Sequence, residues 1–174
     1  MNHHNQNGNQ NHQHHDEGRH DPNKGHKDKS PKDNIVDIDA EMIYQEKHWK
    51  PLSELRPDLV DSFKEGTSPL TQMLKDHTCE GVLHIKGSFF EAHMQEIMGS
   101  IRHSDDMARE RDPMNRVVNI VRLDDMDIGI FTSKNQLAVT LGKKLDSAYK
   151  GGDLNITWSK GDREVEVVWT KDLD

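Results

Sequence analysis

The sequence is poor in the residues that build a hydrophobic core, and the shortage is uneven along the chain. Hydrophobic residues make up 32% of the 174 positions and aromatic residues 5%, whereas charged residues make up 31%. Such proportions are typical of a disordered chain, or of a folded domain joined to a polar tail. Residues 1–34 contain no Ile, Leu, Val, Phe, Tyr or Trp, and every Trp and Phe lies beyond residue 48. We therefore expect a polar tail over 1–34, followed by one folded domain of ordinary size.

Cysteine is almost absent as well. The single cysteine, Cys79, excludes a disulfide within the chain and a zinc site made of four cysteines from one chain. No apolar run approaches the roughly 20 residues that a membrane-spanning helix needs. The N-terminus also lacks the apolar core and the small-residue cleavage site of a signal peptide. We therefore expect a cytoplasmic protein that is not associated with a membrane.

Positively charged residues are fewer than negatively charged ones. The net charge is −8 with histidine neutral, and from Asp33 onward 18 Lys and Arg stand against 27 Asp and Glu. Nucleic-acid-binding domains usually carry a basic surplus, because their cations neutralise phosphates. The balance argues against strong electrostatic binding to RNA or DNA over the whole surface and leaves a local basic patch open.

Histidine, by contrast, is plentiful, and most of it lies in the tail. Seven of the 12 histidines fall within residues 1–33, among Asn, Gln, Gly and Lys. Such a segment cannot bury enough apolar surface to offset its ordering entropy, so we expect it to be disordered. His12, His14 and His15 are close enough in sequence to chelate a transition metal weakly. The tail is therefore either a plain solvated segment or a weak metal-binding tract.

The residues after the tail divide into two stretches. Residues 35–80 carry scattered apolar positions interrupted by three prolines, and we expect an irregular segment there. Within it, Ser68 followed by Pro69 predicts the cap and first position of a short helix. Residues 35–38 suggest a short edge strand.

From Gly81 onward the pattern becomes regular, which defines an expected domain over 81–174. The sequence predicts strands, and helices capped by Ser88 and Ser133, in the order β-α-β-β-α-β-β. Two helices on one face of such a sheet give an α+β fold, a split-βαβ, ferredoxin-like sandwich with one extra strand. The apolar spacing predicts these buried positions: Phe90, Met94, Ile97, Met98 and Ile101 on the first helix, Leu137, Leu141, Leu145 and Ala148 on the second, and Leu154, Ile156, Trp158, Val165, Val167 and Trp169 on the final hairpin.

Candidate chemistry is sparse. His77, Cys79, His84 and His93 offer zinc-binding atoms but lack a CxxC or HxxxH spacing. No nucleophile elbow or phosphate-binding loop is present. We therefore expect no catalytic residues and no cofactor, and interpret the protein as a non-enzyme.

Four residues are candidates for binding. His93 lies at the edge of the buried stripe of the first helix, with Glu96 about one turn further on. A histidine in this position is either a half-buried structural residue bonded to a neighbour or part of a binding site. Lys150 and Gly151, directly after the second helix, complete the candidate set.

Several segments occur in an order that resembles a known family. They are "HDPNK" at 20–24, "GVLHIKGSFFEAHMQEI" at 81–97, "TSKNQLAVTLGKKLDSAYKGGDLNITW" at 132–158 and "VEVVW" at 165–169. Together they resemble small bacterial zinc-ribbon proteins that are distantly similar to the N-terminal region of the large-ribosomal-subunit export adaptor. Where that family carries its ribbon cysteines, this chain has "AEMIYQEKHW" at 40–49 and "SPLTQMLKDH" at 68–77. The resemblance therefore implies a degenerate ribbon that holds no zinc.

The resemblance also implies a function. It points to a ribosome-associated or RNA-binding role, with ribosomal RNA or a ribosomal protein as partner. The family positions that survive here include His93, Glu96, Tyr149 and Gly151. Our first hypothesis is a non-enzymatic domain that binds such a macromolecule. The alternative is a stress-associated protein-interaction or metal-buffering protein that acts through its His-rich tail.

Overall fold

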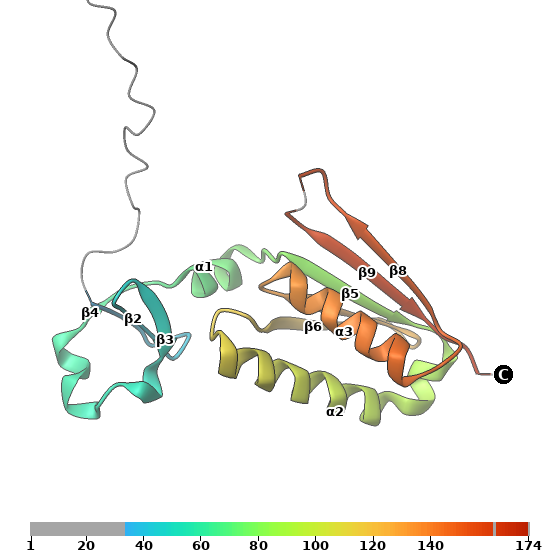
Figure 1. Cartoon of the computed structure of the whole chain (residues 1–174), viewed down its shortest axis with the longest axis horizontal. Coiled ribbons are helices and arrows are strands. Elements are labelled where there is room, and N and C mark those ends of the chain that lie inside the picture. Colours follow the sequence, from blue (N-terminus) through green and yellow to red (C-terminus); the bar gives the residue numbers. More distant parts are fainter. Residues whose placement is uncertain (1–33, 162, 174) are drawn as a thin grey trace, which may run out of the picture. The chain divides into compact units, whose positions relative to one another are not determined.

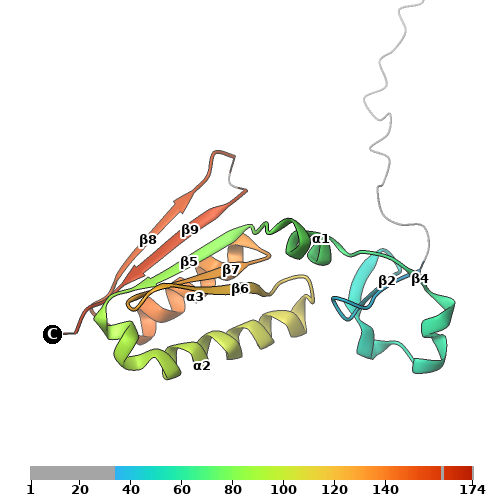
Figure 2. The same cartoon turned by 180° about the vertical axis from the view of Figure 1, so that it is seen from behind.

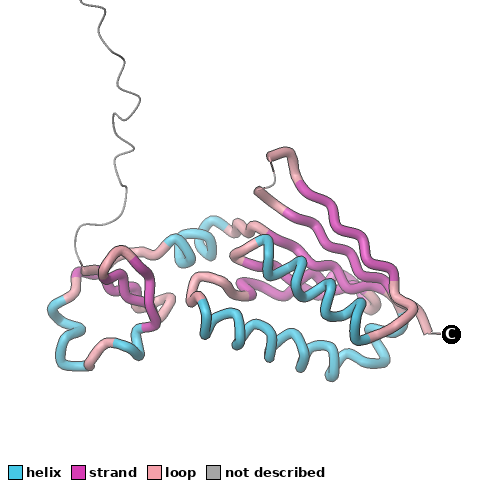
Figure 3. The backbone as a smooth tube through the Cα atoms, in the orientation of Figure 1, coloured by secondary structure: helices cyan, strands magenta, loops and turns pink. Residues whose placement is uncertain are grey.

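The computed structural model of the chain describes residues 34–161 and 163–173. The predicted tail, with His12, His14 and His15, lies outside the described residues apart from its last position. The described elements are shown in Figures 1 and 3. In order they are β1 (Ile35–Asp37), β2 (Met42–Gln45), β3 (His48–Pro51), η1 (Leu52–Glu54), η2 (Pro57–Ser62), β4 (Lys64–Glu65), α1 (Pro69–Asp76), β5 (Gly81–Lys86), α2 (Ser88–Arg111), β6 (Val117–Asp124), β7 (Asp127–Thr132), α3 (Asn135–Ala148), β8 (Asp153–Trp158) and β9 (Val165–Thr170).

The large sheet has five strands in the order β6-β7-β5-β9-β8. β5 pairs antiparallel with β7 and parallel with β9, and β8 and β9 form an antiparallel hairpin. Helices α2 and α3 pack on one face of this sheet, and in Figure 2 the strands are drawn in front of α3. The predicted α+β class and element order are confirmed. Among the described residues, no helix is long and apolar enough to cross a lipid bilayer.

The extra strand of the ferredoxin-like order lies inside the sheet. β9, the last strand of the chain, inserts between β5 and β8, so the strand that follows α3 is displaced to the edge. Burial explains this arrangement, because Val165, Val167 and Trp169 of β9 are almost completely buried, whereas β8 is largely exposed. The more apolar strand of the hairpin takes the inner position.

The core of this region lies between the large sheet and the two helices. The predicted stripe of α2 is buried at Phe90, Ile97 and Ile101, and Met94 and Met98 pack at its edge. On α3 the prediction holds at the three leucines and is wrong at Ala148, which is exposed because α3 ends there. Trp158 is also more exposed than predicted, at 37%. Its partner across the hairpin is Val165, so the two hairpin tryptophans do not face each other.

The predicted caps of the two long helices are wrong. The N-cap residues are Gly87 and Lys134, and neither makes a side-chain capping bond. Instead, the backbone N–H of Ser88 donates to the Asp172 carboxylate at 3.0 Å, so the end of the chain caps α2. Ser133 donates its hydroxyl to the carbonyl oxygen of Met114, which ties the start of α3 to the segment before β6. Both serines serve tertiary contacts that a local pattern does not reveal.

The segment 35–80 is not irregular, as the sequence pattern suggested, but contains a small sheet in the order β3-β2-β1-β4. β1, expected at an edge, lies inside this sheet between β2 and β4. The strands are two to four residues long and turn through left-handed residues such as Glu41 and Lys47, so no periodic apolar pattern marks them. The predicted start of α1 is confirmed, because the Ser68 hydroxyl accepts from the N–H of Thr71 at 3.1 Å.

A buried carboxylate joins the small sheet to α1. Asp37, only 2% exposed, accepts hydrogen bonds from the backbone N–H groups of Ala40 and Ser68. Burial alone would raise the pKa of Asp37, but the hydrogen bonds from Ser68 and Ala40 outweigh it and hold the pKa below its ordinary value. Asp37 therefore stays charged and fixes the start of α1 against β1.

Candidate functional site

The predicted binding residue His93 lies at a kink in α2. Its backbone angles, φ −115° and ψ 18°, leave the helical region and interrupt the helix one turn after its start. The imidazole stacks on the Phe89 ring with 4.1 Å between ring centroids and 23° between planes. Its Nδ1 lies 3.7 Å from Oε2 of Glu96. Two of the four predicted residues are therefore neighbours in space, and Phe89 joins them.

Tyr149, directly after α3, connects this pair to the rest of the core. Its hydroxyl donates to Oε1 of Glu96 at 3.0 Å, and its ring meets that of Phe89 edge-on at 5.3 Å. Burial, followed by the hydrogen bond to Glu96, raises the pKa of Tyr149. The tyrosine is therefore a neutral donor at physiological pH, and it holds the Glu96 carboxylate near His93.

The other two predicted residues follow Tyr149 directly in the chain. The ammonium group of Lys171 donates to the carbonyl oxygen of Lys150 and lies 4.7 Å from the centre of the Phe89 ring. Gly151 adopts φ +86°, a conformation that L side chains rarely take, and so lets the chain turn from α3 into β8. His93 and Glu96 thus belong to one aromatic cluster, formed by Phe89, His93, Tyr149 and Trp169, whereas Lys150 is linked to it only through its backbone carbonyl.

The contacts of the aromatic cluster are mostly internal. Trp169 is completely buried, and a Cβ atom on Gly152 would come within 2.6 Å of its indole nitrogen. Tyr149 and Lys171 bond and stack within the cluster, and Glu96 binds Tyr149 at its exposed rim, where the Glu96 side chain is 67% exposed. The arrangement therefore fixes the start of α2, the end of α3 and the end of β9 together, which is a structural role.

A second site, which the sequence did not reveal, is a pocket of about 310 Å³ where β5 begins and the β8–β9 hairpin turns. Cys79 and Val82 are among its apolar lining residues, whereas the side chain of Trp158, which also borders the pocket, shares the helix-covered side with its register partner Val165. Val82 and Glu166 are register partners on adjacent strands, and both lie opposite the helix-covered face, because their strand neighbours are buried in the core. The pocket therefore opens on the face of the large sheet that carries no helix.

The charges around this pocket are of one sign. Glu80, Glu164 and Glu166 line it, and among the described residues no Lys or Arg does. Glu80 is partly neutralised by Lys134, whose Nζ lies 3.4 Å from Oε1, while no described residue forms an ion pair with Glu164. We call this site the acidic pocket.

His84 lines the floor of the acidic pocket between two carboxylates. Its Nε2 lies 3.8 Å from Oε1 of Glu166, and its Nδ1 lies 3.5 Å from Oδ1 of Asp127. Lys86 contributes a cation to the same row, with its Nζ 3.1 Å from Oδ2 of Asp127. The uncovered face thus carries a row of polar and charged side chains across β7, β5 and β9.

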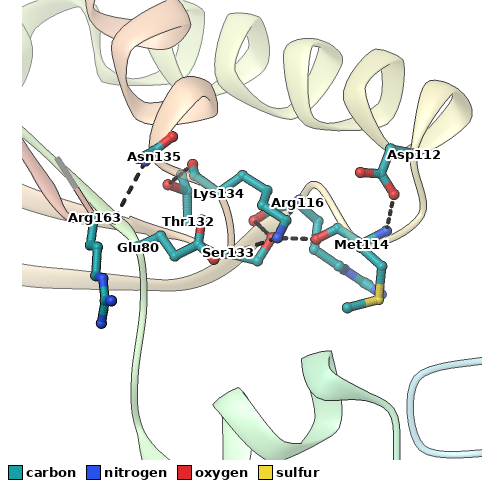
Figure 4. A network of polar contacts seen from close by, with 9 residues as sticks. All are labelled: Glu80, Asp112, Met114, Arg116, Thr132, Ser133, Lys134, Asn135 and Arg163. Atoms are coloured by element: carbon teal, nitrogen blue, oxygen red, sulfur yellow. Dashed lines mark hydrogen bonds and ion pairs between the residues drawn. The ribbon is translucent and has the colours of Figure 1, made fainter. Parts of the chain in front are cut away.

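A polar network at the start of α3 holds the wall of the acidic pocket (Figure 4). Thr132 donates its hydroxyl to the carbonyl oxygens of Gly81 and Lys134, and Lys134 reaches Glu80. The Asn135 side chain donates to the carbonyl oxygen of Arg163 at 3.4 Å, which ties the hairpin turn to α3. The strand start and the hairpin turn that flank the pocket are therefore anchored to one helix.

Cys79 is a poor nucleophile in this setting. Burial, with a smaller effect from the Glu164 charge, raises the pKa of the Cys79 thiol, so that it stays protonated at neutral pH. His77 ends α1 in a left-handed conformation, φ 53°. Within the part of the chain that the structure describes, no three His, Cys, Asp or Glu side chains are placed to hold a metal ion. The four residues with zinc-binding atoms thus form no metal site there.

Comparisons of the chain with protein-family models, with curated proteins and with solved structures found no match.

Proposed function

We propose that this protein is a non-enzymatic domain that binds a basic macromolecular partner, and that the partner is a protein. The observation that carries the proposal is the acidic pocket, whose lining has three glutamates and, among the described residues, no Lys or Arg. The charge balance of the chain points the same way, because −8 overall favours a partner of opposite charge.

The family resemblance suggests two partners, ribosomal RNA or a ribosomal protein, and the charges favour the second. Glu164 and Glu166 would repel a phosphate backbone, whereas a protein that itself binds RNA phosphates presents the Lys and Arg that a carboxylate attracts. Of the two lysines near the aromatic cluster, Lys171 donates a hydrogen bond to the carbonyl oxygen of Lys150 and is therefore partly committed to an internal contact. A basic ribosomal protein is the partner we expect.

The absence of enzymatic activity is part of the proposal and has its own support. The thiol of Cys79 stays protonated, which makes this residue a weak nucleophile. The metal-buffering alternative depends on His12, His14 and His15, which lie outside the described residues, and it stays a prediction.

The test separates the two partners with the full-length protein. Purified ribosomal particles, their RNA stripped of protein, and their protein fraction freed of RNA are each mixed with the protein, and binding is measured at low and at physiological salt. We expect binding to the particles and to the RNA-free protein fraction, weakening as salt screens the charges. Binding to the RNA alone would support the RNA hypothesis instead. Binding to none of the three would overturn the proposal.

A further inference from the structure

A larger cavity, which shares no lining residue with the acidic pocket, is lined by the small-sheet region and the end of α2. Its volume is about 930 Å³, within the range of roughly 300–1,000 Å³ that small-molecule sites typically have. The end of α2 and the segment before β6 contribute two cations, Arg109 and Arg116. The small-sheet region contributes a mainly apolar wall that includes Met42, Leu52, Leu55, Pro57 and Val60. We call this site the arginine pocket.

The apolar wall and the segment that carries Arg116 are packed against each other. Met42 of β2 belongs to a buried apolar cluster, and Met114 and Val118 pack against this cluster. These two residues flank Arg116 in the sequence. The two parts of the arginine pocket are therefore held together by direct apolar contact.

Both arginines keep unused hydrogen-bond donors. Their side chains are half-buried, yet neither guanidinium group forms a hydrogen bond or an ion pair with a described residue. Burial, followed by the charge of Arg109, lowers the pKa of Arg116, while Asp105 and Glu41 act in the opposite direction. A guanidinium group stays charged in proteins even so. Two cations therefore lie near each other, with donors that the described part of the chain does not use.

Three carboxylates also line the arginine pocket, but they lie nearer to solvent. Glu41, Asp106 and Glu110 are exposed, whereas the two arginines are half-buried. Water and salt screen exposed charges more strongly than partly buried ones. The deeper charges of the pocket, which a bound group would meet, are therefore the positive ones.

Hydrogen bonds fix the backbone that carries Arg116 (Figure 4). Its N–H donates to the hydroxyl oxygen of Ser133 at 2.9 Å, and its carbonyl oxygen accepts from the N–H of Ser133 at 2.9 Å. The Asp112 carboxylate accepts from the N–H of Met114 at 2.9 Å, which holds the turn between α2 and β6. The base of the Arg116 side chain is thus placed before a ligand arrives, which lowers the entropic cost of binding.

An anionic group on an apolar body matches both parts of the arginine pocket. The planar fork of an arginine donates paired hydrogen bonds to a carboxylate or a phosphate. An apolar body attached to that group can cover Leu52, Leu55 and Val60. We infer that the arginine pocket binds a small amphipathic anion, a carboxylate or phosphate that carries an apolar chain or ring. This site is separate from the acidic pocket, and the inference does not rest on the proposed function.

The experiment uses probes that differ in one property at a time. The ¹⁵N-labelled full-length protein is titrated with octanoate, with octyl phosphate and with neutral octanamide, each below the concentration at which it forms micelles. We expect saturable shifts of the Leu55 and Val60 amides and of the Arg116 side-chain Nε–H with both anions, and the tighter anion identifies the preferred head group. Octanamide is expected to shift none of them. Acetate and inorganic phosphate, which lack the apolar body, should bind about tenfold more weakly.

Variants test the two parts of the pocket. The double substitution Arg109→Gln and Arg116→Gln is expected to weaken octanoate binding about tenfold, and Leu55→Ala about threefold. Arg116→Lys keeps the charge and loses the planar fork, so it should weaken binding less than Arg116→Gln. Arg102→Gln is the matched control, because Arg102 is an exposed arginine on α2 outside the pocket. Each single substitution is measured as well, and the amide spectrum of each variant verifies that it is folded.

The outcomes of these titrations are distinct. Equal shifts with octanamide, no saturable binding of either anion, or anion binding that survives the arginine substitutions would overturn the inference. Weakened octanoate binding in the arginine variants, with Arg102→Gln unchanged, is the result we expect. The same variants should bind the RNA-free ribosomal proteins with unchanged affinity, because the two pockets share no lining residue. The inference and the proposed function are therefore tested independently.

Discussion

The two sheets of this protein are stabilised in different ways. The large sheet buries an extensive apolar core that includes completely buried residues such as Phe90, Ile97 and Trp169. The small sheet buries fewer apolar residues, which are Val36, Ala40, Met42, Ile43 and Tyr44, together with Leu70 of α1. It also contains the buried, charged Asp37, whose hydrogen bonds join the sheet to α1. One region is stabilised mainly by hydrophobic burial, and the other adds a buried polar junction to a few apolar contacts.

Because of this difference, the two regions should lose stability under different conditions. Apolar burial contributes roughly 25 cal/mol for each Å² removed from water and is insensitive to pH. A buried carboxylate with backbone donors depends on one charge, so its contribution disappears when that charge is removed. Truncation of large side chains should therefore damage the large sheet most, and acid should damage the small sheet first.

The largest effect is expected for Trp169→Ala. This side chain is completely buried and contacts both the aromatic cluster and Gly152, so its removal should cost about 3–5 kcal/mol of unfolding free energy. The matched control is Trp158→Ala on the same hairpin, which should cost much less because Trp158 is 37% exposed. Denaturant unfolding followed by circular dichroism measures both. Equal losses would mean that the hairpin is not packed as described.

The next effect concerns Asp37→Asn, which should cost about 2–3 kcal/mol, because it replaces a charged acceptor of two backbone N–H groups. Its folded-state pKa is lowered, so the stabilisation is present above the unfolded pKa of about 3.9 and is lost as the pH falls through the folded pKa. Hydrogen exchange of β1 and β2 amides between pH 7 and pH 3 checks this. The pH dependence of this hydrogen exchange should be flatter in the variant than in the original protein. An unchanged pH dependence in the variant would exclude Asp37 as its cause. Ser68→Ala, which keeps the backbone N–H, should cost only about 1 kcal/mol.

The same division explains what the sequence could predict. The large region follows periodic apolar patterns, and these identified its strands, its helices and most of its core. The small sheet has strands of two to four residues held by Asp37, whose partner Ser68 lies 31 positions away, and no local pattern signals such a contact. The sequence did not predict the acidic pocket for the same reason, since Glu80 and Glu164 come together only through the parallel pairing of β5 with β9. Of the four predicted binding residues, His93 and Glu96 are neighbours in the structure, and a binding role for the four stays a prediction.

His93→Ala tests whether the aromatic cluster is structural or a binding site, and its effect on stability should be smaller, about 1 kcal/mol. The expected cause is loss of the stacking on Phe89 and of the polar contact with Glu96. Binding to the RNA-free ribosomal proteins should be unchanged, because the acidic pocket lies at the opposite end of β5. If the variant were stable but failed to bind, the aromatic cluster would be the site and the acidic pocket would not.

The smallest effect concerns the reactivity of the Cys79 thiol. This reactivity reports on the electrostatic potential inside the acidic pocket. Burial and, second, the Glu164 charge raise the thiol pKa, so reaction with a disulfide reagent at pH 8 should be slower than for a free cysteine. Glu164→Gln removes only the second cause. The thiolate fraction and the rate should therefore rise modestly, and raising the salt concentration should reduce the difference between the two proteins. Glu54→Gln, far from the thiol along the chain and outside the pocket, should react at the original rate. A Glu164→Gln rate equal to that of the control would mean that the Glu164 carboxylate does not act on the pocket interior, and it would weaken the case for a cation there.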